Sequence, residues 1–134
     1  MEGLVGDAAT LTEMHPNLAT LQRLDELDRL IAVSDERPVL LFKHSYTCGV
    51  SAEALDELIA HLDDEIAGVQ YAMVTVQTHR EVSNAVSTRL GVRHETPQAL
   101  LVRDGRVVWS ASHFRVNAAE LSKALRDRLA GDEA

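Results

Sequence analysis

The order of helix-like and strand-like segments constrains the fold of this chain more than any other feature of its sequence. Amphipathic helical periodicity covers four segments, at about residues 21–33, 49–67, 80–90 and 117–129. Runs typical of strands lie at residues 39–42, 70–76, 99–102 and 106–110. Asp104-Gly105 favours a tight hairpin between the last two runs, and a short extended segment is predicted near residues 15–19. This order requires a parallel half and an antiparallel half in one sheet, so we expect an α/β fold with a central mixed sheet of roughly four to five strands, flanked by helices on both faces.

The length and charge of the chain bound its organisation and its partners. Its 134 residues fit one domain, which we place at residues 17–130, after a flexible N-terminal arm at residues 1–16 that lacks sustained periodicity. The net charge of −8 is the opposite of the basic face that a nucleic-acid partner requires. No basic leader opens the chain, and no apolar stretch approaches the roughly 20 residues that span a bilayer. We therefore expect a cytoplasmic protein with neither a nucleic-acid nor a membrane partner.

Cys48 is the one cysteine of the chain and stands where an apolar strand gives way to a helix. The unpaired backbone N–H groups and the positive dipole end of a helix favour a thiolate over a thiol, so this position suits a nucleophile. The alternative is an inert buried cysteine, which is the commoner fate of this residue type. Ser51 occupies the position three residues further on, so an internal disulfide cannot form after the thiol reacts. Turnover must use a second thiol.

Four blocks of sequence carry a family resemblance. They are Phe42-Lys43-His44-Ser45-Tyr46-Thr47-Cys48-Gly49-Val50-Ser51, Val92-Arg93-His94-Glu95-Thr96-Pro97-Gln98, Asp104-Gly105-Arg106-Val107-Val108-Trp109 and Ala111-Ser112-His113. In this order and spacing, over roughly residues 20–125, they resemble the monothiol bacilliredoxin (YtxJ-like) family of the thioredoxin-like superfamily. The resemblance implies a thioredoxin-like fold and a thiol-disulfide oxidoreductase that removes bacillithiol, a low-molecular-weight thiol, from protein mixed disulfides. The implied partners are S-thiolated client proteins, with bacillithiol as a co-substrate and no bound cofactor.

The resemblance also implies roles for individual residues. Cys48 is the expected nucleophile, with Thr47 and Gly49 beside it in the substrate-binding loop. Ser51 lies in the first helical turn, where its hydroxyl either hydrogen-bonds the Cys48 thiolate or caps the helix. Thr96-Pro97 resembles the cis-proline segment of thioredoxin-like proteins, which faces the active cysteine and offers backbone groups to an extended substrate.

Gly49 departs from the family pattern, because members typically have proline after the active cysteine. Proline suits the first helical turn, whereas glycine loosens it. We expect the change to alter the surface presented to the incoming disulfide, and with it the redox potential and the substrate preference.

Further residues of the matched blocks are candidates for supporting roles. Lys43 and His44 precede the cysteine and could make its surroundings electropositive. A solvated strand end for Lys43 and a hydrogen-bonded structural histidine for His44 are the simpler interpretations. His94, Glu95 and His113 either orient the thiol ligand or anchor their loops, and we favour anchoring. The six histidines and one cysteine form no recognisable zinc spacing, so no metal site is expected.

Two other functions fit parts of the sequence. Cys48-Gly49-Val50-Ser51 is similar to the Cys-Gly-Phe-Ser motif of monothiol glutaredoxins, which hold iron–sulfur clusters between two protomers. The chain lacks the Gly-Gly that follows the cis-proline strand in those proteins. A thioredoxin-fold binding module would instead keep a peptide groove and would not depend on Cys48 for its activity. The leading hypothesis is a monothiol oxidoreductase that acts as a monomer or weak dimer.

Overall fold

The computed structural model describes residues 15–63, 66 and 68–133, so most of the predicted N-terminal arm lies outside the described residues. The elements are β1 (Leu18–Thr20), α2 (Leu24–Val33), β2 (Val39–His44), α3 (Gly49–Leu62), β3 (Gln70–Thr75), α4 (Arg80–Leu90), β4 (Gln98–Arg103), β5 (Arg106–Ser112), the 3₁₀ helix η1 (His113–Arg115) and α5 (Ala118–Glu133). They follow the predicted order, although α2 begins later and α3 ends earlier than predicted. Within the described ranges, none of the helices combines the length and the apolar character that crossing a membrane needs.

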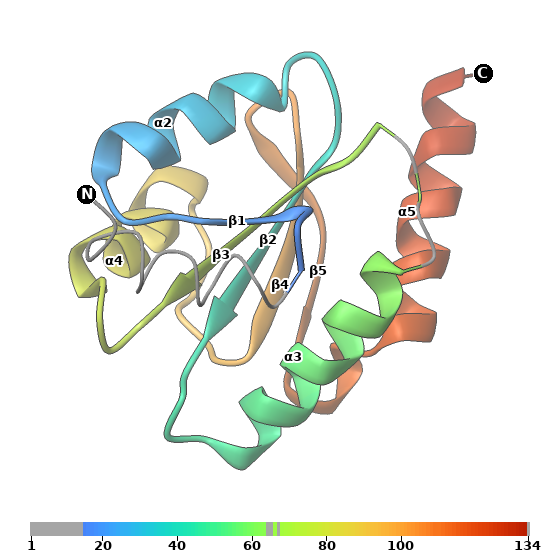
Figure 1. Ribbon diagram of the computed structural model, residues 1–134. Helices are drawn as coiled ribbons and strands as arrows, with labels where there is room; N and C mark the ends of the chain where they lie inside the picture. The colour runs from blue at the N-terminus through green and yellow to red at the C-terminus, as the bar shows by residue number, and fades with distance from the viewer. Residues whose placement is uncertain (1–14, 64–65, 67, 134) are drawn as a thin grey trace.

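The strands form one mixed sheet in the order β1-β3-β2-β4-β5. β1, β3 and β2 are parallel, and β4 and β5 are added antiparallel, which confirms the predicted α/β class with two kinds of pairing in one sheet. Figure 1 shows α2 and α4 on one face and α3 and α5 on the other. His44 pairs with Thr75 of β3, and Lys43 pairs with Gln98 of β4. The ends of β2 and β3 and the start of β4 therefore lie at one edge of the sheet.

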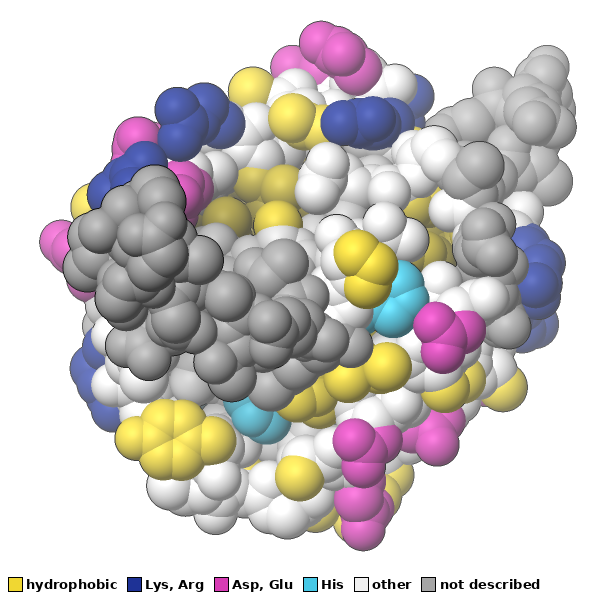
Figure 2. Space-filling view, viewed as in Figure 1, with side chains coloured by type: hydrophobic (Ala, Val, Ile, Leu, Met, Phe, Trp, Pro, Cys, Tyr) yellow, Lys and Arg dark blue, Asp and Glu magenta, His cyan; other side chains and the backbone are white. Residues whose placement is uncertain are grey.

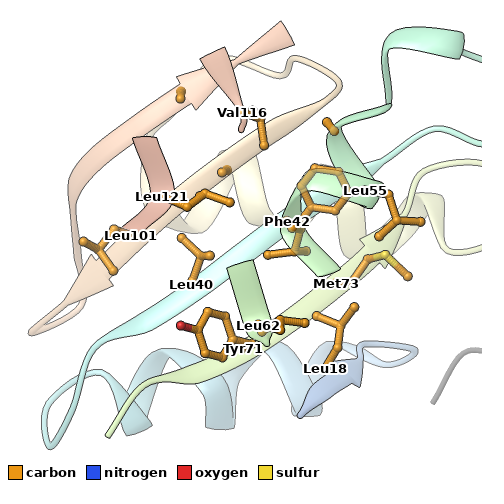
Figure 3. Packing of buried hydrophobic residues seen from close by; sticks show 14 of the residues in the cluster. Leu18, Leu40, Phe42, Leu55, Leu62, Tyr71, Met73, Leu101, Val116 and Leu121 are labelled. Carbon is orange, nitrogen blue, oxygen red and sulfur yellow. The ribbon is translucent and has the colours of Figure 1, made fainter. Parts of the chain in front are cut away.

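β2 is buried along its whole length, which includes Lys43 and His44 beyond the predicted buried run of residues 39–42, and its alternating side chains enter two hydrophobic clusters. Leu40 and Phe42 pack in the cluster on the face of α3 and α5, which Figure 3 shows from close by. Leu41 belongs to the second cluster, on the face of α2 and α4. Because successive side chains of a strand point to opposite faces, Lys43 lies on the second face and His44 on the first.

The start of α2 differs from the prediction for a local reason. The N–H of Leu21 donates to the carbonyl of Met73 (2.8 Å) and so prolongs the extended backbone beyond β1. The Glu26 side chain then accepts a hydrogen bond from the N–H of Arg23 (3.0 Å). A glutamate three residues into a helix satisfies a free N–H group at its start. The helix consequently begins at Leu24 rather than near residue 21.

The predicted hairpin between β4 and β5 is confirmed. Its turn residues, Asp104 and Gly105, have φ values of 55° and 74°. Positive φ at both central positions is the geometry that matches the twist of antiparallel strands, and an Asp-Gly pair adopts it readily. The hairpin brings the end of β5, and with it η1, back to the sheet edge at which β2 ends.

Candidate functional site

Cys48 lies at the first turn of α3, at the sheet edge where β2 ends. Its backbone is extended (φ −116°, ψ 122°), and its carbonyl accepts the first helical hydrogen bond from the N–H of Ala52 (3.1 Å). Its own N–H donates to the carbonyl of Ser45 (3.3 Å), and the residue is partly exposed. The first turn of α3 contains no acidic side chain. The sulfur therefore belongs to a residue at the positive end of a helix dipole with no opposing carboxylate in that turn, a setting that suits a nucleophile.

The acidic side chains of α3 begin one turn further along the helix. Glu53, Asp56 and Glu57 are exposed, as the predicted polar face of this helix requires. Figure 2 shows carboxylates gathered over α3 in this view of the surface. Glu57 accepts a hydrogen bond from the N–H of Ala118 (2.8 Å) and so satisfies a donor at the start of α5. This group of carboxylates lies outside the turn that carries the thiol.

The Ser51 hydroxyl makes neither of the two contacts predicted for it. It is fully buried, accepts a hydrogen bond from the N–H of Ser45 (2.9 Å) and lies 2.8 Å from Nδ1 of His44. Among the described residues it forms no hydrogen bond with the Cys48 sulfur, and α3 has no side-chain cap. Because one lone pair accepts from Ser45, the hydroxyl hydrogen is available to Nδ1 of His44. Ser51 therefore holds the turn that leads to Cys48.

His44 is a hydrogen-bonded structural histidine, as the simpler interpretation predicted. Its ring stacks on Phe42 with 5.9 Å between centroids, and burial lowers the pKa of His44 below its ordinary value of 6.5. His44 therefore supports the turn through its contact with Ser51.

The Thr96–Pro97 peptide bond is cis and lies at the same sheet edge, directly before β4. The carbonyl of Pro97 accepts a hydrogen bond from the N–H of His113 (2.9 Å), whose φ is 57°. The backbone of His113 thus joins η1 to the cis-proline segment. Across the described part of the chain, the N–H and carbonyl of Thr96 have no hydrogen-bond partner. These groups can therefore pair with an extended chain, as an added strand would.

Lys43 is not the solvated strand end that we favoured from the sequence. It is fully buried, because the alternation along β2 turns its side chain into the face covered by α4. Its Nζ lies 2.7 Å from Nδ1 of His94 and 3.3 Å from Oγ of Ser87. Burial lowers the pKa of Lys43 from 10.5 to about 8. Burial, and then the charges of Lys43 and Arg80, lower the pKa of His94. The pair anchors the segment before Thr96 to β2.

Gln77 belongs to this site although the sequence analysis did not single it out. It follows β3, and its amide forms hydrogen bonds with Ser45, Tyr46 and Thr47, the three residues between β2 and Cys48. A signal was available in the sequence. Residues that follow two neighbouring parallel strands meet at one edge of the sheet, so a polar residue just after β3 is a candidate for contact with the Cys48 loop.

A family model matches the part of the chain that carries this site. The model, described as monothiol bacilliredoxin BrxC, matches residues 19–121, which include Cys48 and the Thr96–Pro97 segment. The chain belongs to the monothiol bacilliredoxin family. Membership of the bacilliredoxins supports a thiol redox role for the site.

Solved structures similar to this bacilliredoxin family member have the thioredoxin fold. One described as a candidate oxidoreductase with a thioredoxin fold is 28% identical, with a TM-score of 0.72 over 83% of this chain and 96% of that chain. Fasciola hepatica thioredoxin is 22% identical, with a TM-score of 0.65 over 81% of this chain and 96% of that one. A poplar thioredoxin h mutant is 21% identical, with a TM-score of 0.69 over 84% and 83% of the two chains. The predicted thioredoxin-like fold is confirmed.

Gly49, the residue predicted to depart from the family pattern, lies at the start of α3, where substitution tests the local backbone. Apart from the two chain neighbours and the nearby backbone of α3, no atom of the described residues lies within 4 Å of the position that a Cβ atom would take at Gly49. Cys48 already has the extended angles that a residue before proline adopts. We expect Gly49→Pro to raise the free energy of unfolding by about 0.4–1 kcal/mol, because proline restricts the unfolded chain. Urea unfolding measures the change, with Gly49→Ala as the control for the loss of glycine freedom alone. A proline variant less stable than both the wild type and Gly49→Ala would contradict this prediction.

Proposed function

We propose that this protein is a monothiol thiol-disulfide oxidoreductase that removes bacillithiol from S-thiolated client proteins through Cys48. The placement of Cys48 carries the proposal. The one cysteine of the chain starts a helix at the sheet edge that also holds the cis Thr96–Pro97 segment. Its membership of the bacilliredoxin family supports the thiol redox role. Since Ser51 stands where a resolving cysteine would stand in a dithiol enzyme, the proposed cycle uses an external thiol.

The proposed reaction has two exchange steps. The Cys48 thiolate attacks the bacillithiol sulfur of the mixed disulfide, a bond forms between these two sulfurs, and the client sulfur leaves as a thiolate that takes a proton from water. The thiolate of a second low-molecular-weight thiol then attacks the bacillithiol sulfur bound to Cys48. This step releases a low-molecular-weight disulfide and restores the Cys48 thiolate. Over one cycle the client cysteine returns to its thiol, one free low-molecular-weight thiol is consumed, and bacillithiol leaves in a disulfide with that thiol.

The surroundings of Cys48 suggest how a client is held. Thr47 and Gly49 border the thiol and are exposed, so both can contact an incoming disulfide. The free backbone groups of Thr96 would pair with the extended client segment around its modified cysteine. The second thiol requires a reducing compartment, and we propose the cytoplasm. The protein would act there on client proteins and bacillithiol, as a monomer or weak dimer.

Mass spectrometry of a model client protein tests the proposed function. One sample of the client carries bacillithiol in a mixed disulfide, and a matched sample carries glutathione. We expect the wild type to remove bacillithiol and to gain the bacillithiol mass at Cys48, and Cys48→Ala to remove nothing. Removal of glutathione alone would reassign the thiol. If neither adduct is removed, the oxidoreductase proposal is wrong, and anaerobic cluster reconstitution then tests the iron–sulfur alternative.

A further inference from the structure

The Gln77 side chain contacts every residue of the short loop between β2 and Cys48. Its Nε2 lies 2.7 Å from Oγ of Ser45 and 3.1 Å from Oγ1 of Thr47. Its Oε1 accepts a hydrogen bond from the N–H of Tyr46 (3.3 Å). The amide of one residue, two positions after the end of β3, therefore contacts all of residues 45–47, which connect β2 to Cys48.

The donors and acceptors of this network define its orientation. The N–H of Tyr46 can only donate, so the amide oxygen of Gln77 must face it, and the amide NH₂ must donate to the two hydroxyl oxygens. These oxygens, of Ser45 and Thr47, are 3.2 Å apart, so one hydroxyl can donate to the other. Ser45 is buried and Thr47 is exposed. Donation from Ser45 to Thr47 avoids a buried hydroxyl hydrogen without a partner, which leaves the Thr47 hydroxyl hydrogen available next to Cys48.

The loop is held from its other side by Ser51. The Ser51 hydroxyl accepts from the N–H of Ser45 (2.9 Å), and the carbonyl of Ser45 accepts from the N–H of Cys48 (3.3 Å). Ser45 is thus fixed through its N–H by the interior of the fold and through its hydroxyl by Gln77. Loss of the Gln77 contacts would remove the hydrogen bonds that join Tyr46 and Thr47 to the end of β3. The loop would then be held to the interior of the fold by the hydrogen bonds of the Ser45 backbone.

We infer that Gln77 is a positioning residue for Cys48. It holds the loop of residues 45–47 so that the thiol stays at the N-terminus of α3 and the Thr47 hydroxyl stays available as a donor beside it. In catalysis this role rests on the proposed function, but the reactivity of the thiol toward a small electrophile does not. The two can therefore be tested separately.

The test compares two glutamines of the same strand region. Gln77→Met keeps the length of the side chain and removes all its hydrogen bonds to the loop. Gln70→Met is the matched control, because Gln70 lies at the opposite end of β3 and contacts Arg37 and the carbonyl of Tyr71. The first measurement is the rate of alkylation of Cys48 by iodoacetamide as a function of pH. We expect Gln77→Met to slow alkylation at pH 7 by about two- to fivefold and to move the pH profile upward, because a thiolate displaced from a helix N-terminus loses stabilisation of that order. Gln70→Met should match the wild type.

Gln77→Glu is the second variant and keeps only the hydrogen bond from the N–H of Tyr46. Its carboxylate can still accept from the N–H of Tyr46 but cannot donate to the hydroxyls of Ser45 and Thr47, and it brings a negative charge to the loop. We expect alkylation slower than in Gln77→Met. Alkylation profiles of both variants that coincide with the wild type would overturn the inference.

The dethiolation assay then separates this inference from the proposed function. If the wild type removes bacillithiol and Gln77→Met lowers kcat with little change in KM, both stand. If alkylation responds to Gln77 but no adduct is removed even by the wild type, the positioning role stands and the proposed function fails. If the wild type removes bacillithiol and Gln77→Met is unchanged in both assays, the positioning role fails alone.

Discussion

Replacing Ser51 with alanine is expected to lower the free energy of unfolding by about 2–6 kcal/mol. The hydroxyl is fully buried and serves two partners, the N–H of Ser45 and Nδ1 of His44. Both partners are themselves buried, so alanine would leave a donor and an acceptor without a hydrogen bond, at a cost of about 1–3 kcal/mol each. Urea unfolding at pH 7 measures the change. The predicted effect is therefore structural, even though this residue stands where a dithiol enzyme has its second cysteine.

Ser110→Ala is the control for the Ser51 prediction. Ser110 is exposed on β5, and its loss should change the free energy of unfolding by no more than about 0.5 kcal/mol. If Ser51→Ala costs less than about 1 kcal/mol, then His44 and the Ser45 N–H find other partners, and Ser51 does not hold the turn as described. An alkylation assay on the same variant measures whether loss of the Ser51 hydrogen bonds also lowers the rate at which Cys48 reacts with iodoacetamide.

Lys43→Met is expected to stabilise the protein by about 1–3 kcal/mol at pH 7. Lys43 is fully buried, its Nζ contacts His94 and Ser87, and no carboxylate forms an ion pair with it in the described part of the chain. A buried ammonium without a counter-ion is costly, and an apolar side chain of similar length removes that cost. His94 is exposed and can bind water once its partner is gone. Lys123→Met, at a side chain with 71% exposure, is the control and should change little.

The difference in free energy of unfolding between Lys43→Met and the wild type should depend on pH in a defined window. The folded protein releases the Lys43 proton near pH 8, whereas the unfolded chain keeps it up to the ordinary pKa of 10.5. Between these values the unfolded state binds more protons, so the stability of the wild type rises with pH, and the methionine variant lacks this rise. The difference in free energy of unfolding between the two proteins is largest below about pH 8 and shrinks toward pH 10.5. A variant less stable than the wild type at pH 7, or a difference constant from pH 7 to pH 10, would contradict the prediction.

Much of the architecture could be predicted from the sequence because it depends on local patterns. The burial of residues 39–42 in β2 follows from an uninterrupted apolar run, and the hairpin follows from Asp104-Gly105, whose backbone preferences are local. The predicted start of α2 is too early, because Leu21 forms a backbone hydrogen bond with Met73 of β3. That contact is with a strand distant in the sequence, so local periodicity does not predict it. The residues next to Cys48 in the chain could be identified as candidates from the sequence. The hydrogen bonds that these residues form could not be predicted from it.

The sequence by itself predicted Cys48 as the nucleophile. It also determined the place of Cys48 between a strand and a helix, the lack of a second cysteine and the mixed sheet, since each depends on residues close in the chain or on the order of elements. Only the tertiary structure decided what surrounds the nucleophile. It buried Lys43 against His94, turned Ser51 toward His44, and brought Gln77 to the loop before Cys48. The physical reason is that a hydrogen bond is directional and short, so its partners depend on how whole elements pack. Periodicity in the chain predicts the face of an element, but packing decides which polar groups meet there.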